Sequence, residues 1–144
     1  MLTNEKQYRI TKAWIKRFET AATALEEDRP GCVDPIILDA QIAGLKGQIA
    51  DLQAEAVEYE ALKSGGVKRF DDSGVASVGV ALIRARIAQG MTQGDLADAM
   101  GMKEQQIQRY EAEKYNAASL RRLAEVAAAL SVRMEITSTI GDGP

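Results

Sequence analysis

Five long polar side chains stand close together about two thirds of the way along the chain. They carry amide, carboxylate and guanidinium groups, and they are Glu104, Gln105, Gln106, Gln108 and Arg109. Such groups make directional hydrogen bonds, and at the start of a helix their length lets them reach the edges of bases in the major groove of DNA. The stretch therefore indicates recognition by hydrogen bonding.

The composition removes most routes to catalysis. The chain has no histidine and one cysteine, Cys32, which excludes most metal sites, Ser–His and Cys–His nucleophile pairs and any disulfide within the chain. The run Ser64-Gly65-Gly66 is too short and too early to be a phosphate-cradling loop. We therefore expect no enzymatic activity, no cofactor and no metal, and we interpret Cys32 as an incidental thiol.

The stretch 91–115 predicts two short helices joined by a tight turn. Thr92 can cap the first helix, in which Leu96, Ala97 and Met100 face inward. Gly101 then tolerates the positive φ of a sharp turn. The second helix, about residues 103–112, buries Ile107 and Tyr110. Because Ala97 is small enough for the two helices to approach closely, we predict a helix-turn-helix unit.

Two further helices and a short strand are expected around this unit. One helix covers about residues 76–89, with Val80, Ile83 and Ile87 on its inner face, and it ends at Gly90. Another covers residues 117–130 and buries Leu120, Leu123, Val126, Ala127 and Leu130. Residues 132–137 alternate apolar and polar side chains, which predicts a strand. A single strand needs a partner, and the same strand of a second subunit would supply one.

The N-terminal part predicts two long helices. The first, residues 7–27, has an apolar face anchored by Trp14 and made of Ile10, Trp14, Phe18, Ala21, Ala22 and Leu25. Residues 28–31 break it, and Asp34 with Pro35 starts the second helix. That helix has a heptad seam of Leu38, Ile42, Leu45, Ile49, Leu52, Ala56 and Tyr59. Either the seam packs on the first helix as a hairpin, or another subunit shares it.

These elements predict a mostly α protein in two parts. Residues 1–63 form the helical hairpin, for dimerisation or partner binding, residues 64–75 a linker, and residues 76–144 the domain with the helix-turn-helix and the strand. The net charge of −3 divides into +2 for residues 80–133 and −5 for the remainder. No run approaches the roughly 20 apolar residues that span a bilayer, so we expect a cytoplasmic protein without a membrane partner.

The segment 81–132 resembles the Xre/Cro family of phage-type repressors and antitoxins, and extra helices flanking such a domain occur in HigA-like antitoxins. The residues that carry the resemblance are Gly90-Met91-Thr92-Gln93, Asp95-Leu96-Ala97, Gly101, Gln105-Gln106-Ile107 and Tyr110-Glu111. It implies a lambda-repressor-like domain that binds double-stranded DNA.

The resemblance also implies roles for single residues. Gln105 reads a base edge and suits adenine, Arg109 suits guanine, and Glu104 and Gln106 complete the base-reading group. Gln93 bonds a phosphate and braces the recognition helix. The other positioning contacts to phosphate come from Thr92, Lys103, Gln108, Lys114 and Asn116.

The segment departs from the family at several points, among them Gly94, which weakens the first helix of the unit, and Ala112, which replaces the family's usual glycine. Lys103 stands where serine or threonine usually caps the recognition helix, and the run Glu111-Ala112-Glu113 is expected to place acid near the DNA. The departure at Lys103 bears on the capping of the recognition helix, and the acidic run predicts modest affinity.

Three functions follow from these features. The first is a sequence-specific repressor that acts as a homodimer, joined by the 132–137 strands or by the heptad seam. The second is an antitoxin whose N-terminal helices bind a toxin and which regulates its own operon, since an acidic module suits a basic RNA-cleaving partner. The third is a helical scaffold that does not bind DNA.

Overall fold

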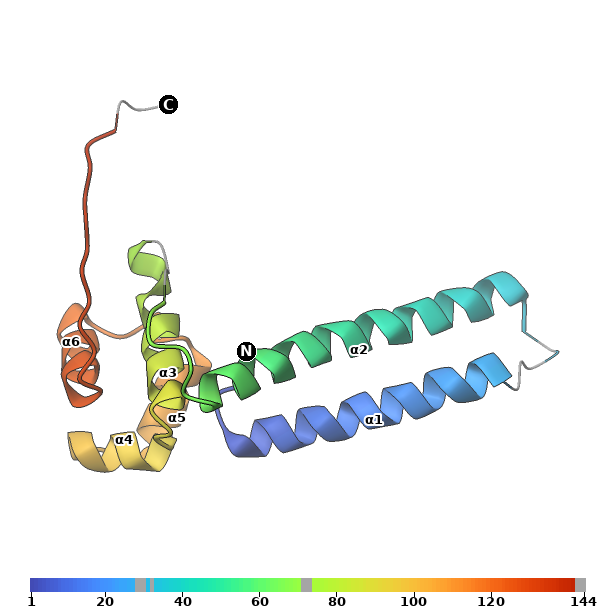
Figure 1. Ribbon diagram of the computed structural model, residues 1–144, viewed down its shortest axis with the longest axis horizontal. Coiled ribbons are helices and arrows are strands. Elements are labelled where there is room, and N and C mark those ends of the chain that lie inside the picture. Colours follow the sequence, from blue (N-terminus) through green and yellow to red (C-terminus); the bar gives the residue numbers. More distant parts are fainter. Residues whose placement is uncertain (28–30, 32, 71–73, 142–144) are drawn as a thin grey trace. The chain divides into compact units, whose positions relative to one another are not determined.

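The computed structural model describes the whole chain except residues 28–30, 32, 71–73 and 142–144. The protein is mostly helical, as predicted (Figure 1). Its elements are α1 (Glu5–Glu27), α2 (Pro35–Lys63), the 3-10 turn η1 (Val75–Ser77), α3 (Val78–Ala88), α4 (Gln93–Met100), α5 (Glu104–Ala112) and α6 (Leu120–Ala129). Cys32 and most of the predicted break before it lie outside the described residues, as does part of the predicted linker.

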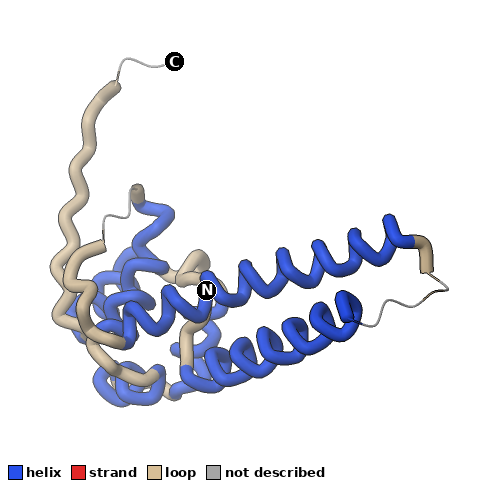
Figure 2. Tube along the Cα trace, turned by 45° about the vertical axis from the view of Figure 1, so that its right-hand side comes forward, coloured by secondary structure: helices blue, strands red, loops and turns tan. Residues whose placement is uncertain are grey.

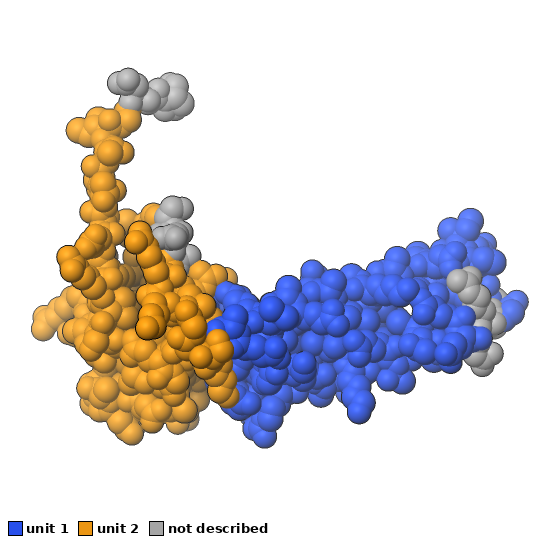
Figure 3. All heavy atoms as spheres, viewed as in Figure 1, with its two compact units in different colours: residues 1–61 blue, residues 62–144 orange. Residues whose placement is uncertain are grey.

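The chain divides into two compact units, residues 1–61 and 62–144, which Figure 3 colours separately. The first unit holds α1 and nearly all of α2. The second begins in the last turn of α2 and holds the remaining helices.

Unit 1 is an antiparallel hairpin (Figure 1), and α2 buries the seam residues Leu38, Ile42, Ala56 and Tyr59 and half-buries the rest of its heptad seam. The rings of Tyr8 and Tyr59 stack at 5.2 Å. Three polar pairs run along one edge: Lys12 with Glu60 at 3.7 Å, Glu19 with Gln53 at 3.3 Å, and Glu26 with Lys46. Each step of seven residues forward along α1 is matched by seven back along α2, which is the register of an antiparallel coiled coil. The predicted helical hairpin is present, and the seam packs on α1 within it.

The apolar face predicted for α1 is partly wrong. Ile10 and Trp14 are 48% and 44% exposed, so Trp14 does not anchor the core. The residues that α1 buries are instead Thr11, Ile15 and Ala22. The heptad register of α2 explains the difference, because a matching seam on α1 must recur every seven residues and so passes through the polar Thr11.

Unit 2 packs α3, α4, α5 and α6 around one core. Its most buried apolar side chains are Leu82, Ile83, Leu96, Ile107, Val126 and Leu130. The inward positions of Leu96 and Ile107 were predicted, whereas Leu120 is 74% exposed and that prediction is wrong. Leu120 directly follows the N-cap Ser119, and the buried face of α6 is centred one to two turns later, at Val126 and Ala127.

The predicted strand 132–137 does not form, and Figure 2 shows this segment as loop. Its last backbone contact is the bond from the Val132 N–H to the Ala127 carbonyl, at 2.8 Å. A strand is defined by ladder hydrogen bonds to a neighbour, and the described part of this single chain offers none to residues 133–137. The side-chain alternation that suggested the strand is therefore present without its partner.

Candidate nucleic-acid interface

The first helix of the predicted helix-turn-helix begins with a complete capping box. The Thr92 hydroxyl accepts from the Asp95 N–H at 3.0 Å, and the Asp95 carboxylate accepts from the Thr92 N–H at 2.8 Å. The hydrogen bond from the Thr92 backbone to the carboxylate, and then one with the Thr92 side chain, lowers the pKa of Asp95. The helix ends at Gly101 with a φ of 63°, the left-handed conformation that glycine tolerates. The predicted cap and turn are both present.

The second helix, α5, is capped in a different way. Lys103 occupies the N-cap position, and its side chain makes no capping bond. The amide oxygen of Gln106 instead accepts a hydrogen bond from the Lys103 N–H at 3.0 Å. This supplies the reciprocal half of a capping box, so α5 has a fixed start despite the departure at Lys103.

A buried polar network joins α3, α4 and α5. Arg86 donates to the two carboxylate oxygens of Glu111 through Nε at 2.6 Å and through Nη2 at 2.7 Å. Its Nη1 donates to the Met91 carbonyl, also at 2.7 Å, which holds the loop between α3 and α4. Gln93, the first residue of α4, donates to the same carboxylate at 2.7 Å. One carboxylate therefore fixes three helices relative to one another.

The expectation that the run 111–113 places acid near the DNA is wrong for Glu111, which belongs to this buried network. Glu111 is 1% exposed and its charge is paired inside the domain, so of the run 111–113 only Glu113 carries an exposed carboxylate. Arg86 is 2% exposed, and it and Glu111 neutralise each other away from the surface.

The segment after α5 packs closely against the start of α3. Lys114 and Tyr115 both have positive φ, 52° and 58°, although neither is glycine. A Cβ at Gly79 would lie 2.0 Å from the Lys114 carbonyl oxygen, so only glycine fits there. Tyr115 is buried and its ring stacks on that of Tyr110 at 5.6 Å. Burial, and then the charge of Glu111, raises the pKa of Tyr115.

All four predicted base-reading residues lie on the exposed surface of α5. The side-chain amide of Gln105 is exposed and makes no hydrogen bond with another described residue, so it can donate to and accept from the edge of a base. Arg109 is 83% exposed and lies 3.8 Å from Glu113, a loose pair. Glu104 accepts from Gln108 at 3.1 Å, and Gln106 is engaged in the cap. Gln105 and Arg109 are therefore the two that the domain leaves most available.

The predicted phosphate-contacting residues are divided between surface and interior. Lys103, Lys114 and Asn116 are exposed, as is Gln108, which bonds Glu104. Thr92 is exposed but its hydroxyl serves the capping box. Gln93 is only 4% exposed and its amide bonds Glu111, an arrangement suited to the bracing part of its predicted role.

Sequence reasoning missed the structural roles of Arg86, Glu111 and Tyr115. A signal existed for two of them. Arg86 lies four residues after Leu82, and Glu111 lies four after Ile107, so each continues the buried face of its helix. No periodicity marks Tyr115, which follows the end of its helix.

Residues 82–136 match the helix-turn-helix family model. This part of the chain is an Xre/lambda-repressor-like helix-turn-helix domain. Domains of this kind bind DNA and regulate transcription, so α4 and α5 are its helix-turn-helix and α5 its recognition helix. No curated protein and no solved structure shows significant similarity to the chain. Among the described residues, no helix is long and apolar enough to cross a membrane.

Proposed function

We propose that this helix-turn-helix regulator is a sequence-specific repressor of transcription that binds double-stranded DNA as a homodimer. The observation that carries the proposal is the exposure of Gln105 and Arg109 on a recognition helix whose position is set by the buried Arg86–Glu111 pair. A glutamine amide matches adenine, and a guanidinium matches guanine O6 and N7. Repression follows from occupancy of the operator. We expect the protein to act in the cytoplasm and to have no catalytic activity.

The homodimer is proposed because one recognition helix reads only a few base pairs. Two helices related by a two-fold axis read two half-sites about one helical turn apart. Of the two dimerisation surfaces that the sequence suggested, the heptad seam of α2 packs against α1 within the hairpin. The C-terminal segment 132–137 is the remaining candidate.

The proposal is tested by selection from a random duplex library with the full chain at near-physiological salt, followed by sequencing. Enrichment of a palindrome supports a dimeric, sequence-specific regulator. Enrichment of a single short half-site supports sequence reading but not the homodimer. If no sequence is enriched, the proposal fails and a scaffold function is favoured.

Two variants separate base reading from phosphate binding. Arg109→Ala should relax the preference at one position of the half-site, by about 1–3 kcal/mol for a bidentate contact to guanine. Lys114→Ala should weaken binding to all sequences alike and reduce the dependence on salt. Identical preference profiles for Arg109→Ala and the unmodified protein would contradict the role of Arg109.

An antitoxin function is the second candidate, and one observation favours it. Ile10 and Trp14 are exposed on α1, and the Arg17 guanidinium lies 5.1 Å from the Trp14 ring centroid. Exposed aromatic and arginine side chains are enriched at protein interfaces, and the chain outside residues 80–133 is acidic. The test is whether a neighbouring gene arrests growth, and whether co-expression of this chain but not of its Trp14→Ala variant restores growth.

A further inference from the structure

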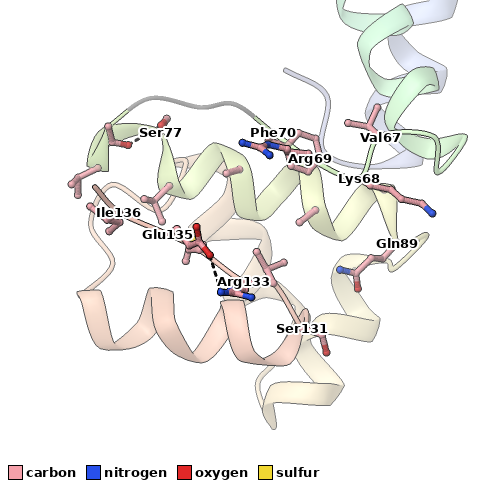
Figure 4. Close-up of a pocket in the computed structure, with 18 of the residues that line it drawn as sticks. Val67, Lys68, Arg69, Phe70, Ser77, Gln89, Ser131, Arg133, Glu135 and Ile136 are labelled. Carbon is pink, nitrogen blue, oxygen red and sulfur yellow. Dashed lines mark hydrogen bonds and ion pairs between the residues drawn. The ribbon is translucent and has the colours of Figure 1, made fainter. Parts of the chain in front are cut away.

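A long groove crosses one face of unit 2. Its walls are two segments far apart in the sequence, residues 67–70 before α3 and residues 131–138 after α6, and its floor is α3 (Figure 4). The floor residues Val78, Ala81, Ala85 and Ala88 have small side chains. The volume of about 1110 Å³ is at or above the upper end for small-molecule pockets. The groove therefore suits a length of polypeptide better than a small ligand.

Both walls carry backbone groups that can pair with a strand. No residue from 133 to 141 makes a backbone hydrogen bond with another described residue, and neither do Val67, Lys68 and Phe70. An extended segment in this state is an open edge, which readily adds a neighbouring strand.

The C-terminal wall also exposes apolar side chains. Val132, Met134 and Ile136 alternate with polar residues, so in an extended chain they share one side. Met134 is 38% exposed and Ile136 is 68% exposed. A second strand beside this wall would cover them.

The direction of the two walls limits what can lie between them. The Gln89 amide donates to the Leu130 carbonyl at 2.7 Å, which ties the start of the C-terminal wall to the end of α3. From there both walls run toward the Ser77 end of α3 (Figure 4). They are therefore parallel to each other, and a strand that runs the opposite way would form antiparallel ladders with both.

The sequence of the C-terminal wall is complementary to itself in that opposite direction. If residues 132–136 pair with a second copy in an antiparallel register centred on Met134, Arg133 of each copy faces Glu135 of the other. Val132 of each copy then faces Ile136 of the other on the apolar side. Opposite charges and apolar pairs directly across a ladder both favour pairing. The wall thus fits a second copy of itself.

We propose that two copies of this chain exchange their 132–137 segments, each segment entering the groove of the other copy. The resulting sheet is antiparallel and has four strands. Their order is residues 67–70 of the first copy, 132–137 of the second copy, 132–137 of the first copy and 67–70 of the second copy. A single two-fold axis at Met134 generates this order, so both grooves fill and the interface is closed. This inference rests on the proposed homodimer and specifies its interface.

Charge reversal tests the register. Arg133→Glu makes the segment wholly acidic and Glu135→Arg makes it wholly basic, and each change places like charges opposite one another in a homodimer. Sedimentation equilibrium of the full chains should show each variant associating at least ten-fold more weakly than the unmodified protein. An equimolar mixture of the two should regain the unmodified association. Arg121→Glu, the same change at a residue 90% exposed on α6, is the matched control and should have no effect.

Disulfide trapping tests insertion into the groove. In a Cys32→Ser background, chains with Lys68→Cys are mixed with chains that carry Glu135→Cys or Thr137→Cys. Neighbouring strands lie about 4.8 Å apart, within reach of a disulfide, so crosslinks between chains should form. When Lys68→Cys and Arg133→Cys stand in one chain, an internal crosslink should be absent, because both positions lie toward the Gln89 end of the groove and the inserted strand separates them by about 10 Å.

The outcomes separate this inference from the proposed function. Recovery in the mixture together with crosslinks between chains supports the exchange. Recovery without crosslinks from Lys68→Cys overturns it, because the segments then pair outside the groove. A dimer that is insensitive to both charge reversals overturns it while leaving the homodimer intact. A monomer that still selects one DNA sequence overturns the inference and the homodimer but not DNA recognition.

Discussion

The DNA-binding unit buries a charged pair, whereas the charged pairs along the seam of the hairpin stay exposed. In the hairpin, Lys12 and Glu60 are about half exposed, and such pairs run along the edge of the seam. In the DNA-binding unit, the side chains of Arg86 and Glu111 are 3% and 0% exposed. Exposed pairs contribute little stability and mainly favour one register. A buried pair is costly to break, because removing one partner leaves an unpaired charge in the interior.

This difference shows that the sequence alone does not reveal whether a charged residue of a helix is exposed or buried. The hairpin has only two layers, so its edges stay in water. The four helices of unit 2 enclose a centre in which a carboxylate with three donors can be accommodated. The position of the recognition helix depends on that centre.

The largest expected effect on stability comes from replacing a paired glutamate by glutamine, a change that can be made in both units for comparison. Glu111→Gln should lower the free energy of unfolding of the DNA-binding unit by about 3–5 kcal/mol, because it leaves Arg86 charged and incompletely paired. Glu60→Gln should cost the hairpin less than about 1 kcal/mol. Amide hydrogen exchange of α5 follows the DNA-binding unit, and the fluorescence of Trp14, the single tryptophan, follows the hairpin. Equal losses would contradict the contrast.

Two glycine positions should respond in opposite directions. Gly79→Ala should destabilise the DNA-binding unit by about 1–3 kcal/mol, because its Cβ meets the fixed backbone of Lys114. Gly47→Ala should stabilise the hairpin by about 0.5–1 kcal/mol, because no atom lies within 4 Å of a Cβ there and alanine favours a helix. Denaturation, followed by amide hydrogen exchange of α5 and by the fluorescence of Trp14, measures both changes in stability. Stabilisation by Gly79→Ala would show that the 114–115 backbone is able to yield.

Removing a tyrosine hydroxyl should also affect the stability of the two units differently, but with a smaller effect. The Tyr115 hydroxyl is buried with no hydrogen-bond partner among the described residues, so Tyr115→Phe should preserve stability or add up to about 1 kcal/mol. The Tyr8 hydroxyl donates to Glu60 at 2.5 Å, so Tyr8→Phe should lower the midpoint of hairpin unfolding. A marked loss on Tyr115→Phe would reveal a partner for that hydroxyl.

The smallest expected effect is the pH dependence of the α4 cap. The bonds from Thr92 lower the pKa of Asp95 in the folded protein below its ordinary value of 3.8. The cap therefore stabilises fully above that value and is lost as the pH falls through the folded pKa. Asp95→Asn should reduce the acid sensitivity of exchange at the first amides of α4. If the acid sensitivity of this exchange is the same in Asp95→Asn and in the unmodified protein, Asp95 is not its source.

Local signals in the sequence determined much of the DNA-binding unit. Thr92 and Gly101 mark the cap and the turn because their chemistry acts within a few residues of the backbone that they fix. The spacing of Leu96, Ile107 and Val126 identified the buried faces, since helical period is a local property. The same reasoning identified the seam of α2 and, from residue type, the candidate base readers Gln105 and Arg109.

Contacts between distant residues were decided only by the tertiary structure. Glu111 looked like surface acid until α3 brought Arg86 to it from 25 residues away. Trp14 looked like a core anchor until the register of α2 selected Thr11 and Ile15 instead. The 132–137 segment has the alternation of a strand but no ladder, because a strand depends on a partner. Periodicity and capping are encoded near each residue, whereas burial, pairing and strand formation depend on which surfaces the fold brings together.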